Sequence, residues 1–250
     1  MSVSGQSGVG LIRLFTDCFG NEIPVGNTEA STTPGHNQGD FSVLGDLDDA
    51  DAGLVLVSKA NGYARLTSSA TTDGDGCALA TEVCLSPALN GTIVVEARVE
   101  RAALTAGTVF IGLAGAAADD IAEPITCATT VLTKVTHCVG FLLNSELTAA
   151  DGIWYMPYLL AGDTTQTSTD VDASQTAVIT ESDIVRLEVD NDGSARWYIN
   201  GVLEQSVGAG LAATATTLMA AVCGVWATTT TVATLDVDYF LVTASRDWAR

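Results

Sequence analysis

The sequence predicts an all-β protein, a sandwich of two antiparallel sheets with about twelve strands. Three observations predict this fold class. Thr, Val, Ala and Gly dominate the composition, and runs of Glu, Lys, Leu and Gln that favour helices are missing. Short β-runs recur along the chain and are separated by turn residues at short intervals. Hydrophobic residues make up 47% of the 250 residues, enough for a large core, and sandwiches of this length fold as one domain.

Residues 1–45 differ from the rest, because they are rich in Gly, Ser, Thr, Asn and Pro around one apolar island, LIRLF. We expect them to form an extended N-terminal arm or loop segment that docks on another surface, and residues 46–250 to form the sandwich. Removal of the arm is then expected to leave a folded β-domain. The candidate docking residues are Leu11, Ile12, Leu14 and Phe15.

The predicted strands follow an acidic turn, GDLDDADAG, and continue almost to the end of the chain. In order they are LVLVSK (54–59), YARLTSS (63–69), CALATEVC (77–84), TIVVEARVE (92–100), TVFIGLAG (108–115), HCVGFLLN (137–144), IWYMPYLLAG (153–162), IVRLEVD (184–190), ARWYIN (195–200), VLEQSV (202–207), TLMAAVCGVWA (217–227) and VATLDVDYFLVTA (232–244). Two segments between them are loop-like, 116–135 and 162–178. No repeat of fixed period occurs, which argues against a propeller or a solenoid.

The clearest local prediction is a three-stranded antiparallel meander over residues 184–207. Val185, Leu187 and Val189 alternate with charged residues, so they share one face of a strand. The dipeptide Asn200-Gly201 then favours a type I′ hairpin turn, which needs positive φ at both central positions.

The charge balance excludes several partners. The chain has 30 Asp and Glu against 10 Lys and Arg, a formal net charge of -20, although charged residues are only 16% of it. Nucleic-acid binding needs clustered Lys and Arg, whereas the basic residues here are scattered singly, so we expect no nucleic-acid partner. Anionic membrane surfaces are disfavoured for the same reason.

One stretch needs a test as a membrane span, because the chain carries no charge between Glu204 and Asp236. It is long enough to cross a bilayer. However, it contains an unbroken Thr run over 228–231 and no basic residues flank it. Two buried strands are the better prediction, and we expect no membrane partner.

The sequence assigns no metal and no cofactor. Six cysteines occur without a CxxC motif, and His137 and Cys138 are adjacent, so in a strand they point to opposite faces and cannot share a metal. We expect reduced, partly buried thiols, with a disulfide left open. The acidic turns around 46–51 and at Asp73 and Asp75 are expected to be solvated; Ca²⁺ binding there stays open as an alternative.

The order of five motifs resembles a known family. They are the EAR strand (96–98), the FIGLAG strand (110–115), the VGF strand (139–141), the WYINGVL hairpin (197–203) and the final DYF strand that ends at Arg246. Over residues 46–246 the chain resembles the concanavalin A-like (laminin G-like) jelly roll, and more narrowly the versions of it in tailed-bacteriophage virion proteins. The resemblance implies a capsid decoration, head-fibre or tail-fibre module, often a homotrimer.

The leading hypothesis is therefore a non-enzymatic virion structural protein, a capsid decoration or head-associated protein attached through its N-terminal arm. Its expected partners are the major capsid protein or other virion proteins and further copies of itself, with a trimer favoured. The N-terminus has no basic segment and no long apolar segment, so no secretory signal is expected. The expected location is the outer surface of the virion, and the host cytoplasm during assembly.

Two alternatives remain. The first is a glycan-binding fibre or lectin-like module that recognises the host surface, with Trp154 and Tyr198 as candidate contacts. The second is a polysaccharide hydrolase or lyase of the same fold. Glu188 and Asp190 are two residues apart on a strand, about 6.6 Å, which falls in the roughly 6.5–9.5 Å window of inverting glycosidases.

The sequence nevertheless supplies no catalytic residue. Asp236 and Asp238 have the same two-residue spacing, but Glu188 and Asp190 lie on the polar side of an alternating strand, which predicts a solvated face. His137 could be placed in a Ser-His-Asp triad, but the sequence has no GxSxG motif to support such a triad. The prediction is that the protein is not an enzyme.

Overall fold

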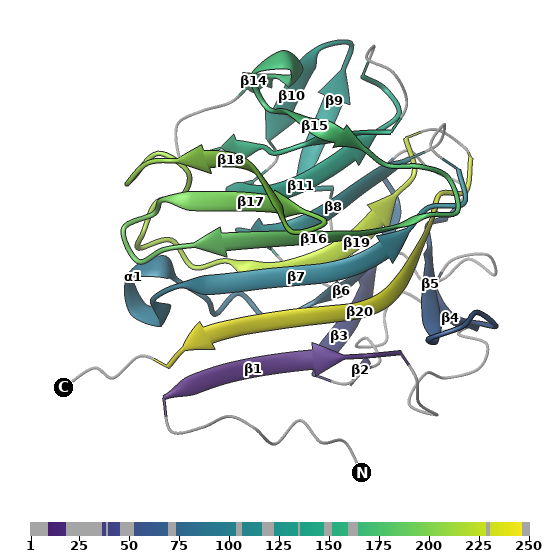
Figure 1. Cartoon of the computed structure of the whole chain (residues 1–250), viewed down its shortest axis with the longest axis horizontal. Helices are drawn as coiled ribbons and strands as arrows, with labels where there is room; N and C mark the ends of the chain where they lie inside the picture. Colours follow the sequence, from purple (N-terminus) through teal and green to yellow (C-terminus); the bar gives the residue numbers. More distant parts are fainter. Residues whose placement is uncertain are drawn as a thin grey trace.

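The protein is a β-sandwich in a computed structural model (Figure 1). The structure describes residues 10–18, 37–38, 40–45, 53–69, 74–103, 107–116, 123–134, 136–147, 152–159, 165–228 and 231–246. These residues form two large antiparallel sheets and one small sheet, with one short helix, α1 (Pro87–Asn90), and a 3-10 turn, η1 (Ser168–Asp170). The predicted all-β class is confirmed.

The front sheet has eight strands in the order β18-β17-β16-β7-β20-β5-β4, with β1 also paired to β20. Their bounds are β1 (Leu11–Thr16), β4 (Gly53–Val57), β5 (Tyr63–Thr67), β7 (Ile93–Glu100), β16 (Ser182–Val189), β17 (Ala195–Ile199), β18 (Val202–Val207) and β20 (Thr234–Ser245). The long strand β20 therefore pairs with three strands, because β5 and β1 lie beside its two halves and β7 lies along its other edge.

The middle sheet has nine strands in the order β15-β12-β11-β8-β19-β6-β3-β2, with β13 also paired to β11. Their bounds are β2 (Asn37–Gln38), β3 (Phe41–Gly45), β6 (Gly76–Ala80), β8 (Thr108–Ala114), β11 (Cys138–Asn144), β12 (Ile153–Tyr155), β13 (Tyr158–Leu159), β15 (Asp172–Thr176) and β19 (Ala220–Trp226). The small sheet consists of β14 (Thr165–Thr167), β10 (Val131–Lys134) and β9 (Ile125–Ala128).

Three layers follow from where the apolar side chains lie. The main core fills the space between the front and middle sheets, with Trp197, Phe141 and Phe240 among its largest side chains. A second core, with Phe110 and Trp226, lies on the other face of the middle sheet under the small sheet. All seven residues of β8 and of β19 are buried, as expected of strands covered on both faces. The front sheet alternates buried and part-exposed residues, so its outer face meets solvent.

The strand predictions hold along the chain. Each of the twelve predicted runs contains a strand, with 153–162 divided between β12 and β13. The meander over 184–207 is confirmed as β16, β17 and β18. At its turn Asn200 and Gly201 have φ values of 51° and 80°, which supplies the two positive angles that the type I′ turn requires.

The two segments predicted as loops are not entirely loops. Segment 116–135 contains β9 and β10, and segment 162–178 contains β14 and β15. The three strands of the small sheet have only three or four residues each, and β9 and β10 bury mainly Ile125, Cys127 and Leu132 against the middle sheet. Such short runs, with so few apolar residues, give too weak an alternation to stand out in a polar segment.

The described parts of residues 1–45 belong to the sandwich. β1 pairs with β20 from Leu11↔Ser245 to Thr16↔Phe240, and β3 pairs with β6 in the middle sheet. Phe41 and Val43 are only 1% exposed in the main core. Because β1 and β3 pair with strands that come after residue 46, removal of residues 1–45 is expected to open the core rather than leave the β-domain intact.

The uncharged stretch tested as a membrane span supplies β19 and the start of β20. Across the described residues, no helix has the length and apolar character needed to cross a membrane.

Candidate functional site

The outer face of the front sheet gathers charged side chains from five strands. Along β7, alternate residues point into the core, which leaves Glu96, Arg98 and Glu100 on the outer side. The same alternation places charged residues of β16, β17, β20 and β5 on that side. The charged residues of this ion-paired face are Lys59, Arg65, Arg98, Arg186, Arg196, Glu96, Glu100, Glu188, Asp190, Asp236 and Asp238.

Three arginines of this face form a straight diagonal row across neighbouring strands. Arg196 on β17 is opposite Glu188 of β16, and Arg186 lies two residues along from Glu188. Arg186 is opposite Glu96 of β7, and Arg98 lies two residues further along in the same direction. Diagonal neighbours of this kind are about 7–8 Å apart in an antiparallel sheet. We call Arg196, Arg186 and Arg98 the arginine row.

Carboxylates join the members of the row at its β17 end. Arg196 Nη1 lies 2.6 Å from Asp190 Oδ2, and its Nη2 lies 3.0 Å from Glu188 Oε2. Arg186 Nη2 lies 2.6 Å from the other oxygen of Glu188, and its Nη1 lies 3.2 Å from Glu96 Oε2. Glu188 therefore bridges two guanidinium groups. Glu188 and Asp190 lie on the outer face of the sheet, as their polar positions predicted, and there they are ion-paired and partly buried.

A β-bulge arranges the other end of the face. The pairing of β20 with β7 shifts between Val237 and Tyr239, so Asp238 is the extra residue, and its carboxylate lies 2.5 Å from Arg98. Asp236 lies 2.5 Å from Lys59 Nζ and 2.6 Å from Arg65 Nε. These contacts extend the ion-paired face past β20 to β5.

Two carboxylates of this face, Asp236 and Asp190, are held in their charged form. Burial alone would raise the pKa of Asp236, but hydrogen bonds from Arg65 and Lys59 outweigh it and hold the pKa below its ordinary value. The hydrogen bond from Arg196 lowers the pKa of Asp190 in the same way. A general acid needs the opposite, a pKa raised toward the working pH. The arrangement is suited to holding charge in place rather than to donating protons.

The two partners of these ion pairs differ in how far their side chains are exposed to solvent. The side chains of the five cations are 29–42% exposed, whereas those of the six carboxylates are 1–25% exposed. Solvent therefore meets the guanidinium and ammonium groups more than the carboxylates with which they pair.

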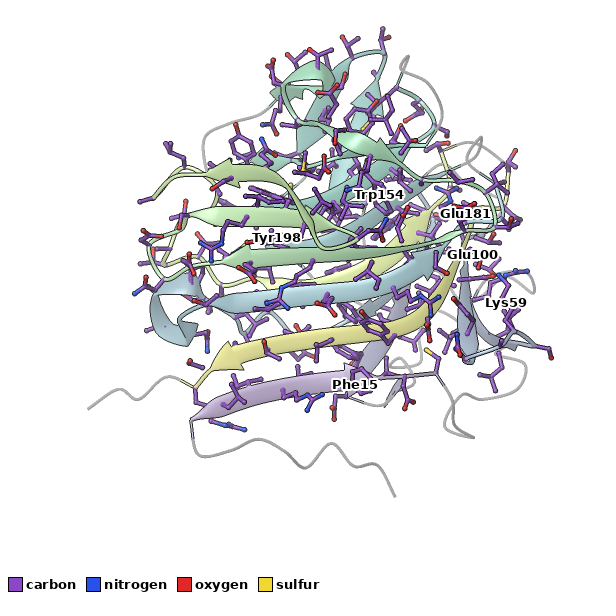
Figure 2. The ribbon with its side chains drawn as sticks, in the orientation of Figure 1. Phe15, Lys59, Glu100, Trp154, Glu181 and Tyr198 are labelled. Carbon is purple, nitrogen blue, oxygen red and sulfur yellow. The ribbon has the colours of Figure 1, made fainter. Side chains whose placement is uncertain are left out.

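Two half-buried tyrosines lie on either side of the arginine row. Tyr198 on β17 is opposite Arg186, and Tyr239 on β20 is opposite Arg98. The hydroxyl of Tyr239 donates to Glu96 Oε1 at 2.8 Å, and burial together with that bond raises the pKa of Tyr239. Its ring also contacts Phe15 of β1, with centroids 6.2 Å apart. In Figure 2, Tyr198, Glu100 and Lys59 follow one another across the front sheet, with Phe15 near its β1 edge.

The structure separates the two candidate glycan contacts. Tyr198 lies on the outer face of the front sheet, as its position in the alternation predicted. Trp154 is 1% exposed in the main core, and its Nε1 donates to Asp183 Oδ2 at 3.0 Å. A buried indole cannot stack on a ligand, so Trp154 is a core residue and is corrected as a candidate contact.

Two of the four candidate docking residues point into the sandwich and two point outward. Ile12 and Leu14 pack against the main core of the same chain. Leu11 and Phe15 point outward, with exposed fractions of 41% and 36%, and the backbone N–H of Phe15 donates to Asp40 Oδ2. The inward-facing residues of the LIRLF segment therefore pack on the sandwich of the same chain.

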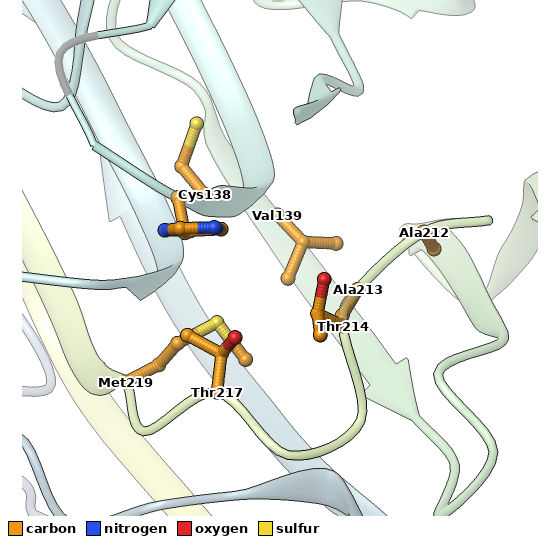
Figure 3. A pocket seen from close by; sticks show the side chains of 8 residues that line it. Cys138, Val139, Ala212, Ala213, Thr214, Thr217 and Met219 are labelled. Carbon is orange, nitrogen blue, oxygen red and sulfur yellow. The ribbon is translucent and has the colours of Figure 1, made fainter. Parts of the chain in front are cut away.

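The other sequence candidates lie apart from this face. All six cysteines are free thiols, and Cys84 is the exposed one. His137 and Cys138 line a small recess with Thr214, Thr217 and Met219 (Figure 3), and no described residue forms a hydrogen bond with the buried Nε2 of His137. Within the part of the chain that the structure describes, no group of His, Cys, Asp or Glu could hold a metal. The acidic turn at 46–51 and Asp73 lie outside the described residues.

Sequence reasoning missed the arginine row. The basic residues are single in the sequence, yet five of the ten meet on one sheet face. The available signal was that Arg98, Arg186 and Arg196 each occupy a polar position of an alternating strand. The diagonal register that aligns them depends on strand pairing, which the sequence did not give between β7 and β16.

Solved structures share this architecture. No family model matches the chain, and neither does any curated protein. A Shewanella oneidensis MR-1 protein of unknown function has a TM-score of 0.60 at 10% identity, over 100% of this chain and 92% of that one. Peanut lectin has a TM-score of 0.53 at 12% identity, over 94% and 97% of the two chains. A family 7 alginate lyase has a TM-score of 0.51 at 14% identity, over 78% and 83%.

These likenesses establish the fold, a concanavalin A-like jelly roll as in lectins. The fold is shared by a non-enzymatic lectin and by a lyase, so it does not decide between binding and catalysis.

Proposed function

We propose that the chain is a non-enzymatic structural protein of a phage particle, a capsid decoration or head-associated protein on the outer surface. The observation that supports this role is the ion-paired face. Each of its carboxylates is bound by a cation, and those of Asp190 and Asp236 are held below their ordinary pKa. A solvent-facing sheet on which cations bind every carboxylate is suited to binding, and Asp190 and Asp236 do not have the raised pKa that a general acid needs. The resemblance to virion proteins supplies the setting.

In this proposal the outward side of β1 attaches the protein to its particle. Leu11 and Phe15 are exposed apolar side chains on an edge strand of an acidic protein, where a partner could cover them. The partner would be the major capsid protein or another virion protein, and the copies would assemble as a cyclic oligomer, a trimer being favoured.

The test is cosedimentation with particles that lack the protein. The intact chain is expected to sediment with them, and Phe15→Asp to remain in the supernatant. Val178→Asp, a matched change at an exposed apolar residue outside β1, is the control and is expected to bind normally. Absence of the wild-type protein from the pellet, and from purified virions by mass spectrometry, would contradict the proposal.

Glycan binding is the second candidate, because Tyr198 and Tyr239 flank a row of hydrogen-bond donors on an open face. Lectins and carbohydrate recognition domains share the fold. A glycan array is expected to show binding that Tyr198→Ala removes and that Leu211→Ala, a change at an exposed residue off this face, retains. An array without signal would contradict it.

The enzymatic alternative has a direct test as well. A panel of polysaccharides incubated with the protein is expected to yield no product. Product formation that is lost in Glu188→Gln/Asp190→Asn would instead assign hydrolysis or lysis to the ion-paired face.

A further inference from the structure

We infer that the arginine row and the two tyrosines beside it bind a linear polysaccharide that carries carboxylate groups. The inference rests on the second candidate function, glycan binding, and adds the chemical class of the ligand.

The first step is the distribution of charge. The ion-paired face holds five cations and six carboxylates, a formal charge of -1. Since the whole chain carries -20, the remaining residues carry -19. The formal charge of this face is therefore close to zero, and salt at physiological strength screens the more distant charges of the chain beyond roughly 8 Å.

The second step is the direction of the donors. On this face the cations are the more exposed partners and the carboxylates the less exposed ones. A guanidinium has five N–H donors. Among the described residues, Arg98 donates through Nη1 to Asp238, which leaves Nε and Nη2 directed to neither oxygen of that carboxylate and open to a ligand. The carboxylates below hold the planar groups in position, which reduces the entropy lost when a ligand carboxylate binds.

The third step is the shape of the site. Arg196, Arg186 and Arg98 are in line at successive diagonal steps of about 7–8 Å across three strands. A compact anion would meet one or two of them. A linear polymer with recurring carboxylates can meet all three, and Lys59 and Arg65 beyond β20 could extend its path.

The fourth step distinguishes sugars from acidic protein. Tyr198 and Tyr239 lie on opposite sides of the row, each partly exposed. A tyrosine ring presents an apolar surface together with a polar tip, which suits the apolar and hydroxyl faces of a sugar ring. An acidic protein surface would use the arginines but would not need rings on both sides of the line.

The experiment is affinity electrophoresis of the full chain in gels containing polygalacturonate, with dextran gels as the neutral reference. We expect polygalacturonate alone to retard the protein, and added NaCl to weaken the retardation. Arg186→Gln is expected to weaken binding about tenfold. This variant should fold, because Glu188 still forms its ion pair with Arg196 and Glu96 still accepts the hydrogen bond from Tyr239. Arg98→Gln and Tyr198→Ala are expected to weaken binding as well.

The control is Lys134→Gln on the small sheet, which removes one positive charge from another layer. It is expected to leave the retardation unchanged, and circular dichroism should show all variants folded. Equal weakening by Lys134→Gln would overturn the inference, since net charge alone would explain binding. Equally tight binding of poly-glutamate would also overturn it, in favour of an acidic protein partner.

The remaining outcomes separate the inference from the function on which it rests. Neutral glycans bound through Tyr198, with no retardation by polygalacturonate, would overturn the acidic ligand and keep glycan binding. No binding to any glycan would overturn both.

Discussion

Asp236 illustrates how a single buried side chain can organise a surface. Its carboxylate is 1% exposed and binds both Lys59 and Arg65, which come from a turn and from a neighbouring strand. The sequence placed Asp236 on a strand, but its partners are 177 and 171 residues away along the chain. Local patterns carry no information about such distant pairs.

Replacing Asp236 by Asn is expected to lower the free energy of unfolding at pH 7 by about 1–2 kcal/mol, since both cationic partners are about a third exposed. The pKa of Asp236 is lowered in the folded state. Its contribution is therefore complete above the ordinary aspartate pKa of about 3.9 and is lost as the pH falls through the folded value. Urea unfolding of both proteins from pH 7 to pH 3 should show the difference shrinking below about pH 4.

The control for this pH series is Glu181→Gln, which removes the same charge from an exposed residue. It is expected to change the free energy of unfolding by less than about 0.5 kcal/mol. An Asp236→Asn variant as stable as the wild type at pH 7 would show that the ion pairs contribute nothing net.

The thiols give a second prediction at this scale. Burial raises the pKa of Cys18 and of Cys77 to about 12, so these thiols stay protonated and unreactive in the native protein. A thiol-specific chromogenic reagent is expected to label Cys84 alone under native conditions and all six cysteines in denaturant.

The matched variant for the labelling is Cys84→Ser, which should abolish the native reaction. Fewer than six reactive thiols in denaturant without a reductant would reveal a disulfide and contradict the free-thiol structure.

At the scale of elements, most strands could be predicted and most pairings could not. Apolar and charged residues alternate over most of 92–100, and this alternation predicts β7. The Asn-Gly dipeptide predicts the hairpin between β17 and β18. The small sheet was missed because its strands are short and polar. The indole of Trp154 was misplaced, since a strand assignment does not say which face of the sandwich is buried.

In its described residues, the segment before residue 46 differs from the loop that its composition favours. Its composition is typical of a loop, yet β3 contributes Phe41 to the main core and β1 extends the front sheet. The reason is that strand β3 has only five residues, FSVLG, and its neighbours in sequence are Gly, Asn and Asp. Composition averaged over forty residues concealed it.

Two phenylalanines of this segment provide a matched test. Phe41→Ala is expected to lower the free energy of unfolding by about 3–5 kcal/mol, because it leaves a cavity beside Phe240. Phe15→Ala, at the partly exposed side of β1, should cost less than about 1.5 kcal/mol. Equal, small losses in urea unfolding would mean that the segment is an independent arm after all.

At the scale of the whole molecule, the layer order decides which strands are protected. β8 and β19 are covered by the front sheet on one side and by the second core on the other. Their backbone amides should exchange with solvent only through global unfolding. The edge strands β1 and β18 should exchange through local opening.

Hydrogen–deuterium exchange measured by mass spectrometry is the check. Peptides from β8 and β19 are expected to exchange last, and peptides from β1 and β18 well before them. Exchange of β19 as early as that of β18 would contradict the three-layer arrangement.

The pairing of β1 with β20 also has a mechanical consequence. Leu11 and Ser245 are partners at one end of this antiparallel pair (Figure 1), so a pull applied to these two residues separates the strands from that end. The hydrogen bonds would then break one after another, as in a zipper, rather than all at once in shear. A tether through this corner would yield at low force by peeling β1 away, while the long contact of β20 with β7 stayed intact.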